Sequence, residues 1–254
     1  MPGGATYVTG LSEGRVTLDA VRAASQVNGA SVSRGTRVAV SGYSQGGGAA
    51  LWAGQVKDDY APELNLTAVA AGGVPGNLPE LFDSLAANPG NLHLRVMILL
   101  GLHHAYPDLP WSTLLTPLGK RRIAQLETKC TVDPGPPGVI GPDSTAAVFT
   151  GLELDDVFST NPLTLDAWRS TALANSPGGS RPASPTLMYG SPADELVPYR
   201  IQREVLADYL RLGADVEWQT TVPLPHGATD LVWSPVVAAW ITARFTEQRS
   251  GATP

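Results

Sequence analysis

The chain has 254 residues, 43% of them hydrophobic and 16% charged, and can bury a substantial core as one domain with an insertion. The formal net charge is −6 and Lys and Arg form no visible cluster, which argues against a nucleic-acid partner, because phosphate binding needs a basic surface. The longest apolar stretch, residues 94–102, is shorter than the roughly 20 apolar residues that cross a bilayer, so we expect no membrane span. An acidic surface suits a neutral or apolar small substrate.

The first residues and the single cysteine give no sign of secretion by themselves. Residues 1–10 lack a basic region followed by an apolar one, so the chain as given shows no signal peptide. Cys130 has no partner for an internal bridge and is interpreted as a semi-buried thiol. A bridge to a segment outside the chain is the alternative.

Helices and strands alternate along the first 75 residues. Residues 13–27 place apolar side chains at helical spacing and predict a helix that ends at an Asn-Gly pair. A short β-branched run predicts a strand over residues 37–42, and an Ala- and Gly-rich helix over residues 45–56 follows it at once. A second, buried strand is predicted over residues 66–71.

Residues 76–176 contain no convincing strand and predict a helical insertion. Pro and Gly clusters separate its short helical patterns, which cover residues 79–87, 91–104, 118–129, 145–158 and 164–174.

Strand signals return after the insertion. A strand over residues 186–190, a helix over 198–212, a strand over 216–222 and a last helix over 230–245 are predicted. Strands that alternate with helices indicate a mostly parallel sheet covered on both faces. We therefore expect an α/β core formed by residues 1–75 and 177–254, with residues 76–176 as a helical cap.

The strongest local signal for chemistry is Gly42-Tyr43-Ser44-Gln45-Gly46. A serine between two glycines, after a strand and before a helix, is typical of the nucleophile elbow. The turn is expected to strain the backbone of Ser44, and side chains at positions 42 and 46 are expected to collide with the neighbouring strand and helix. Strand and helix on the correct sides disfavour the alternative, a glycine-rich loop capped by a serine.

A serine hydroxyl needs a base, and His226 is the favoured candidate among four histidines. It lies in a turn after the last predicted strand and before the last predicted helix, where a loop at the carboxyl edge of the sheet can reach Ser44. His93, His103 and His104 lie in the insertion and are interpreted as surface or core-edge residues.

Asp194 is the candidate acid that orients the base. It follows the strand over residues 186–190, and the order Ser44, Asp194, His226 is the chain order expected of an α/β-hydrolase triad. A helix-capping carboxylate is the alternative reading of Asp194. Glu195 and Asp230 are the fallback acids, and Asp230 is expected to cap the final helix instead.

A metal site is not predicted, because His103 and His104 are adjacent on a helix and no third ligand lies at a recognisable spacing. Several apolar residues of the insertion are candidates for an acyl-binding site, with ordinary core packing as the equal alternative. These residues are Leu99, Leu102, Trp111, Leu114 and Leu115.

Several segments together resemble the secretory lipase family, which groups bacterial secreted lipases with the lipase A type of yeast enzyme. The acid segment Asp194-x-x-Val197-Pro198 and the base segment His226-Gly227 also match that family's motifs. Cutinases share Gly-Tyr-Ser-Gln-Gly, but the large helical insertion argues against them. The other matching segments are residues 12–15, 18–24, 42–47, 50–53 and 60–64.

The resemblance implies an α/β-hydrolase core with a helical cap, hydrolysis of acyl esters without a cofactor, and secretion. Members of the family place several strands and an acidic loop before the segment that matches Tyr7 and Ser12. The resemblance therefore implies that these N-terminal strands are missing here, together with the second oxyanion donor, which leaves the backbone N–H of Gln45 as the donor in hand. Because one lost donor costs about a hundredfold to a thousandfold in turnover, weak activity is expected.

We expect a serine esterase or lipase that hydrolyses carboxylic esters, triacylglycerol among them, through an acyl-enzyme on Ser44. One alternative is a non-catalytic or weakly active fragment that needs a partner segment for the missing strands. Another is an acyltransferase or peptidase with the same triad. The exposed strand edge at residues 37–41 also leaves association of copies of the chain open.

Overall fold

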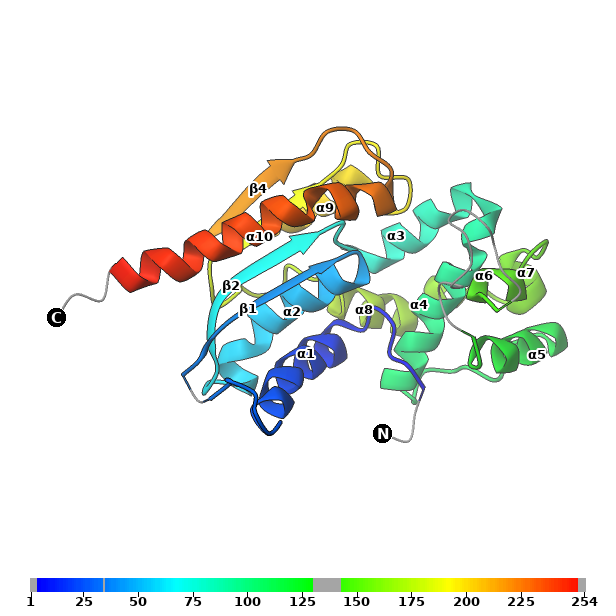
Figure 1. Cartoon of the computed structure of the whole chain (residues 1–254). Helices are drawn as coiled ribbons and strands as arrows, with labels where there is room; N and C mark the ends of the chain where they lie inside the picture. Colours follow the sequence, from blue (N-terminus) through cyan, green and yellow to red (C-terminus); the bar gives the residue numbers. More distant parts are fainter. Residues whose placement is uncertain (1–3, 34, 130–142, 251–254) are drawn as a thin grey trace. The chain divides into compact units, whose positions relative to one another are not determined.

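The computed structural model describes residues 4–33, 35–129 and 143–250, with side chains described as far as Thr246 (Figure 1). Cys130 lies outside the described residues. The chain forms two compact units: the described residues up to Thr9 with Pro79–Ala174, and Gly10–Leu78 with the residues from Asn175 onwards. Among the described residues, no helix is long and apolar enough to cross a membrane.

The second unit is built on a four-stranded parallel sheet in the order β1-β2-β3-β4. The register pairs Tyr43 with Gly72 and Gly72 with Tyr189, so the carboxyl ends of the strands are level. Within the described residues β1 has a neighbour on one side only. The strands are β1 (Arg37–Tyr43), β2 (Asn65–Gly72), β3 (Thr186–Gly190) and β4 (Val216–Thr220).

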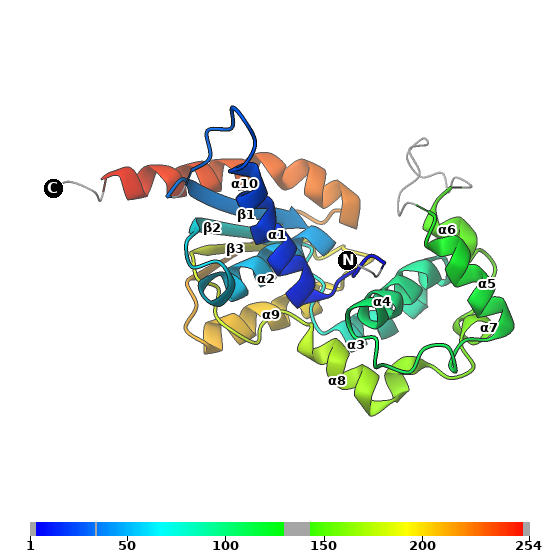
Figure 2. The same ribbon diagram turned by 90° about the horizontal axis from the view of Figure 1, so that it is seen from below.

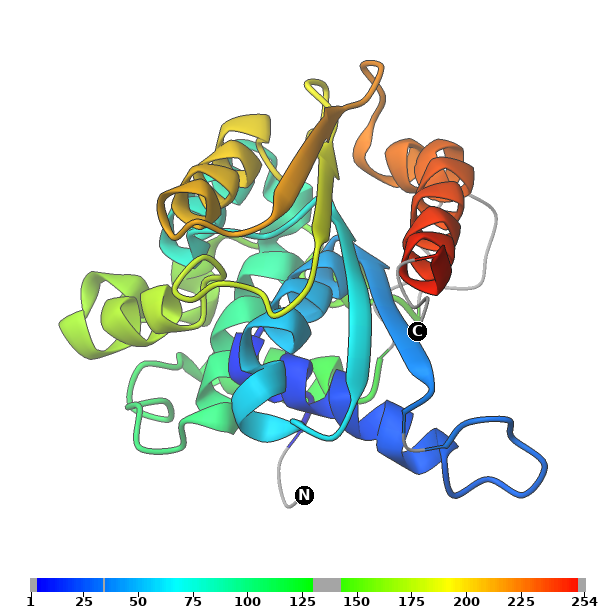
Figure 3. The ribbon, with the colours of Figure 1, turned by 90° about the vertical axis from the view of Figure 1, so that its left-hand side faces the viewer.

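Helices cover both faces of this sheet, as the sequence predicts. α1 (Gly10–Ala24), α2 (Gln45–Tyr60) and α9 (Tyr199–Arg211) lie on one face, and α10 (His226–Ser250) lies on the other (Figures 2 and 3). Side chains of β2 alternate accordingly: Val69 packs in the core cluster of the first three helices. Its neighbour Ala70 packs in the cluster that contains Val237 of α10.

The first unit is helical in its described residues, apart from an isolated antiparallel bridge between Leu115 and Phe158. The predicted helix over residues 145–158 is two short helices, because Gly151 adopts a φ of 74° between them. The insertion contains α3 (Leu78–Ser84), η1 (Leu85–Ala87), η2 (Pro89–Asn91), α4 (Leu92–Ala105), α5 (Pro117–Leu126), α6 (Thr145–Val148), α7 (Leu154–Val157), η3 (Pro162–Thr164) and α8 (Asp166–Ala174).

The two ends of the insertion lie side by side on the sheet-containing unit. The backbone N–H of Leu78 donates a hydrogen bond of 2.9 Å to the hydroxyl of Ser176. One residue earlier in the second segment, the carbonyl of Asn175 accepts a bond of 3.2 Å from the indole of Trp52 on α2. The residues at which the chain enters and leaves the helical insertion are thus held within the sheet-containing unit.

Candidate active site

Ser44 lies on a sharp turn between β1 and α2. Its backbone has φ 56° and ψ −124°, a conformation that a residue with a side chain rarely adopts. The turn is held at both ends, because the N–H of Ser44 donates to the carbonyl of Gly72 at 2.9 Å and its carbonyl accepts from Gly48 at 3.1 Å. The hydroxyl of Ser44 makes no capping hydrogen bond to α2, so the helix does not engage it.

The glycines around this turn have unequal roles. A Cβ at Gly42 would lie 2.1 Å from the carbonyl oxygen of Gly46, so position 42 requires glycine, as predicted. The predicted collision at position 46 is wrong for the described residues, because a Cβ there would meet nothing within 4 Å. Position 47 was not predicted, yet a Cβ at Gly47 would lie 2.4 Å from the carbonyl oxygen of Gly72. Close contact between α2 and β2 therefore falls at position 47.

Gln45 is the first residue of α2, and its backbone N–H has no carbonyl one turn earlier in the helix to bond. The side-chain amide donates to Glu13 of α1 at 2.6 Å and is thereby directed toward that helix. The partial positive charge of the helix N-terminus surrounds this N–H. The arrangement suits the stabilisation of negative charge beside Ser44.

Asp194 and His226 form a buried pair. Nδ1 of His226 lies 2.9 Å from each carboxylate oxygen of Asp194, and the two side chains are 9% and 0% exposed for His226 and Asp194 respectively. An ionised carboxylate can only accept, so the neutral imidazole carries its proton on Nδ1 and presents Nε2 as a base. Nε2 has no hydrogen bond to any described residue, the Ser44 hydroxyl included.

Two further bridges join the loop after β3 to the loop after β4. The buried hydroxyl of Ser191 donates to the carbonyl of Leu224 at 2.6 Å and accepts from the N–H of Leu224 at 2.9 Å. The carboxylate of Glu195 accepts from the backbone N–H of His226 at 2.8 Å. The relative position of Asp194 and His226 is therefore fixed by backbone contacts between their loops as well as by the contact between their side chains.

The last helix begins at His226 and not at Asp230, which corrects the predicted boundary. Glu195 takes the free backbone N–H at the start of this helix, which is the capping role expected of Asp230. Asp230 is exposed inside the helix, and its carboxylate makes no hydrogen bond to the described residues. Of the three candidate acids, Asp194 contacts the imidazole ring.

The turn after β2 connects the serine to the histidine. Gly72 accepts the N–H of Ser44, and a Cβ on the next residue, Gly73, would lie 3.1 Å from Cε1 of His226. The ring of Tyr43, the residue before Ser44, lies 4.9 Å from the imidazole between ring centroids. Ser44 and His226 are thus neighbours of the same two-residue turn at the carboxyl edge of the sheet.

Tyr43 was predicted only as part of the elbow, but its ring packs against the base. Its hydroxyl is buried. Burial raises the pKa of the Tyr43 phenol, and the Asp194 carboxylate raises it further, against a smaller opposing effect of the Thr229 hydroxyl. Tyr43 is therefore a neutral phenol throughout the pH range in which His226 could act.

The other three histidines lie in the helical unit, as predicted. His93 bonds the carbonyl of Gly90 through Nδ1 at 2.9 Å. His103 stacks on Trp111 with centroids 4.9 Å apart, and His104 bonds the carbonyl of Ala5 at 3.0 Å. Among the described residues, no group of three or more His, Cys, Asp or Glu side chains could hold a metal ion.

The five apolar residues predicted for an acyl site all belong to the helical unit. Leu99 and Leu102 are fully buried in α4, which suits the core of this unit. Leu114 and Leu115 are half-buried, and Trp111 packs its ring between His103 and Phe158. Their part in substrate binding stays a prediction.

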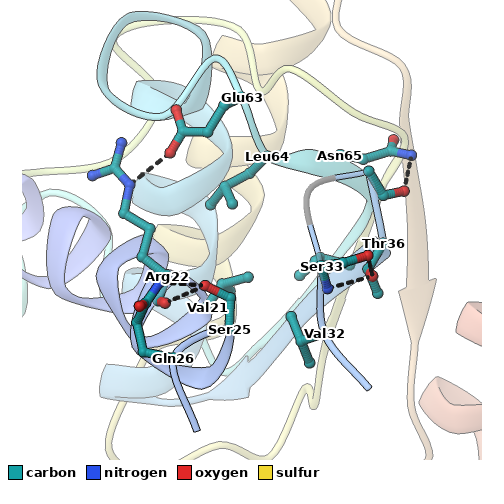
Figure 4. Close-up of a pocket in the computed structure, with 12 residues that line it drawn as sticks. Val21, Arg22, Ser25, Gln26, Val32, Ser33, Thr36, Glu63, Leu64 and Asn65 are labelled. Carbon is teal, nitrogen blue, oxygen red and sulfur yellow. Dashed lines mark hydrogen bonds and ion pairs between the residues drawn. The ribbon is translucent and has the colours of Figure 1, made fainter. Parts of the chain in front are cut away.

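A cavity of about 440 Å³ lies at the opposite, amino-terminal end of β1 and β2 (Figure 4). Arg22, the cationic side chain among the described residues that line it, is engaged, because it lies 2.7 Å from Glu63 and 2.8 Å from Asp19. A hydrogen bond between Ser33 and Thr36 lies at its wall. The polar groups of this cavity bind one another and lie at the wrong end of the sheet to join Ser44.

A strained serine between a strand and a helix, with a buried acid–base pair after later strands of a parallel sheet, defines the α/β-hydrolase class. The family model described as secretory lipase matches residues 2–252. The chain belongs to the secretory lipase family.

Relatives of this chain include proteins named as secreted lipases and one named as a probable inactive lipase. The secreted triacylglycerol lipase LIP5 of Malassezia furfur is 27% identical over 248 residues, which cover 94% of this chain and 62% of that protein. A probable inactive lipase of Mycobacterium tuberculosis is 29% identical, over 90% of this chain and 50% of that protein.

The fold matches that of lipase A from Candida antarctica in its closed state. The TM-score is 0.79 at 23% identity, and the match covers 98% of this chain and 56% of that chain. At this identity the likeness concerns the fold alone. Across these three comparisons, the chain spans between 50% and 62% of the length of the proteins it matches.

Proposed function

We propose that the chain carries the catalytic triad of a carboxylic ester hydrolase, with Ser44 as nucleophile, His226 as base and Asp194 as the acid that orients the base. The observation that carries the proposal is the buried His226–Asp194 pair at 2.9 Å, beside the turn that also holds Ser44. The family supports hydrolysis of carboxylic esters as the reaction.

In the proposed mechanism, the hydroxyl oxygen of Ser44 attacks the ester carbonyl carbon while Nε2 of His226 takes the hydroxyl proton. The carbonyl oxygen becomes an oxyanion that accepts a bond from the N–H of Gln45. His226 then protonates the leaving alkoxide, which departs as an alcohol and leaves an acyl-enzyme. Water deprotonated by His226 attacks this acyl group, releases the carboxylic acid and restores Ser44.

The proposed substrate is an ester with an apolar acyl group, and the chain is proposed to act outside the cell. Support comes from relatives named as secreted triacylglycerol lipases. We further propose that the helical unit serves as a cap that receives the acyl chain. Its apolar candidates are Leu99, Leu102, Trp111, Leu114 and Leu115.

A nitrophenyl ester of a short fatty acid tests the assignment of the nucleophile. The native chain is expected to release a burst of nitrophenol stoichiometric with enzyme, and Ser44→Ala is expected to release none. Equal release by both proteins would refute the assignment. Circular dichroism of the two proteins controls for folding, because the Ser44 hydroxyl caps no helix and its loss should leave the fold intact.

A second candidate function is favoured by the unpaired side of β1. In it the chain is a weakly active or inactive unit until a partner segment pairs with β1 and supplies a second oxyanion donor. A monomer with a cooperative melt and a full nitrophenol burst would exclude this candidate. A folded chain without a burst, which gains one when a strand-bearing partner is added, would support it.

A further inference from the structure

Gln202 is a fully buried polar residue next to the acid, and sequence analysis did not single it out. We propose that Gln202 is a positioning residue that holds the carboxylate of Asp194 in the orientation that the base requires. The inference rests on the proposed function and adds a member to its site. Gln202 lies in the first turn of α9, which follows the loop that carries Asp194.

The orientation of the Gln202 amide is determined by its surroundings. Nε2 lies 2.9 Å from the carbonyl oxygen of Val197 and 3.3 Å from Oδ2 of Asp194. Both neighbours only accept, so the two protons of the amide nitrogen are used and the flipped amide would set oxygen against oxygen. The donor therefore faces the acid in the stable arrangement.

Gln202 holds the carboxylate oxygen that the acid loop itself leaves unfixed. The N–H groups of Leu196 and Val197, from the same loop as Asp194, bond Oδ1 at 3.1 and 2.8 Å. Oδ2 receives its bond from α9 through Gln202. With one oxygen held from each side, rotation of the carboxylate about its Cβ–Cγ bond is restrained, in an orientation that places both oxygens 2.9 Å from Nδ1 of His226.

The position has an energetic cost, because one polar atom of the buried amide is left without a partner. The amide oxygen of Gln202 is buried without a partner among the described residues, and a Cβ on Gly190 would lie 2.1 Å from it. A methionine would fill similar space without a polar atom to satisfy. A half-satisfied buried amide calls for an explanation, and the bond from its donor to the acid supplies one.

The test compares Gln202→Met, which removes the donor, with Gln202→Glu, which sets a carboxylate against the acid. The matched control is Gln55→Met, because Gln55 is a bridging glutamine of the same unit that bonds Gly178 and Tyr209 and does not contact the triad. Two readouts are taken: kcat and KM on a nitrophenyl ester, and the tautomer of the neutral His226 ring from its ¹⁵N chemical shifts. The second readout needs no turnover.

Gln202→Met is expected to lower kcat about 10- to 100-fold with KM unchanged, since misplacement of a catalytic group by about 1 Å has effects of this size. It should also reduce the fraction of His226 protonated on Nδ1. Gln202→Glu at pH 8 should lower kcat further, because an ionised carboxylate repels Asp194. Gln55→Met should lower the melting temperature and leave kcat and the tautomer as in the native chain.

An unchanged tautomer and kcat in Gln202→Met, with only a lower melting temperature, would overturn the proposal. If Gln202→Met does not fold, Gln202→Glu takes its place, and an unchanged His226 tautomer in Gln202→Glu would overturn the proposal. If the native chain hydrolyses no ester but Gln202→Met still shifts the tautomer, the positioning role stands and the proposed reaction falls.

Discussion

Gly47 is a residue at which α2 packs closely against β2, and it offers a test of the elbow. Gly47→Ala would set a methyl group 2.4 Å from the carbonyl oxygen of Gly72, the same oxygen that accepts the N–H of Ser44. We expect a loss of about 1–3 kcal/mol in the free energy of unfolding, as for overpacked cores. Urea denaturation measures this loss.

Gly46→Ala is the matched control, because a Cβ at position 46 meets no described atom within 4 Å. Alanine favours the helix over glycine by about 0.5–1 kcal/mol, so this variant should match or exceed the native stability. A loss in Gly46→Ala as large as that in Gly47→Ala would contradict the packing described for α2.

At the residue scale, the sequence predicts the groups that its motifs mark and misses those that only contacts define. Ser44, Asp194 and His226 were found from glycine spacing, chain order and position after strands, and their catalytic roles stay predictions. Gly47 and Gln202 carry no such mark. Each matters because of a contact with a residue outside its own helix, Gly72 in one case and Asp194 in the other, and no local sequence pattern reports such a contact.

The loops after β3 and β4 depend on Ser191 for their relative position. Ser191→Ala would leave the N–H groups of Leu224 and Ala193 without their partner, and the Leu224 carbonyl with only the 3.3 Å bond from the Thr229 hydroxyl. We expect a loss of about 1–3 kcal/mol in the free energy of unfolding and faster hydrogen exchange at the Leu224 amide. Hydrogen exchange followed by mass spectrometry or NMR measures the second effect.

Ser184→Ala is the control for this bridge. The buried Ser184 hydroxyl donates a single bond of 2.6 Å to the carbonyl of Leu66, away from the base loop. Its loss should reduce stability and leave exchange at Leu224 as in the native chain. Unchanged exchange at Leu224 in Ser191→Ala would show that the base loop is held by other contacts.

Helix α4 should make the helical unit sensitive to mild acid through His103. Burial lowers the pKa of His103, and the neighbouring His104 lowers it further. The unfolded chain then binds more protons near pH 6, so stability is complete above about pH 6.5 and falls as the pH drops below it. His103→Phe keeps a ring against Trp111 and removes the titrating group.

The fall in melting temperature between pH 7.5 and pH 5.5 should therefore be smaller in His103→Phe than in the native chain. Part of the fall should remain, because burial also lowers the pKa of His93. Equal acid sensitivity in the two proteins would rule out His103 as a source.

At the element scale, predicted boundaries differ from the structure where a bond made elsewhere decides them. The last helix was expected from Asp230, a residue with cap propensity, but Glu195 from another loop caps it at His226. The pattern over residues 145–158 is helical at both ends, and the left-handed Gly151 divides it. Neither fact is readable from hydrophobic periodicity.

The free side of β1 should make the whole molecule prone to association. Ser41 is exposed on this edge strand, and α10 on the same sheet exposes apolar residues such as Leu231, which is 79% exposed. Edge strands pair with other chains unless charge or shape prevents it. We expect an apparent mass that rises with concentration in light scattering, and Ser41→Lys should reduce that rise.

Thr113→Lys adds the same charge at an exposed position of the helical unit and serves as the control. If both lysine variants lower the apparent mass equally, net charge and not the β1 edge governs association.

At the scale of the whole molecule, the sequence predicts the parallel sheet well because four β-branched or apolar runs alternate with amphipathic helices. Strand order follows chain order here, so no rearrangement of the strand order had to be guessed. The free edge at β1 was also expected, from a family resemblance and not from the residues themselves.

The hydrogen bond between Leu78 and Ser176 has a consequence for how such a chain can be rebuilt. Leu78 and Ser176 lie at the start and the end of the helical insertion, which is nearly a hundred residues long. A peptide of a few glycines and serines could therefore replace the insertion and join the two residues. Closing a short loop costs little conformational entropy. Excision at these points, or exchange of the excised block for the corresponding block of another family member, should leave the sheet and the Asp194–His226 pair in place.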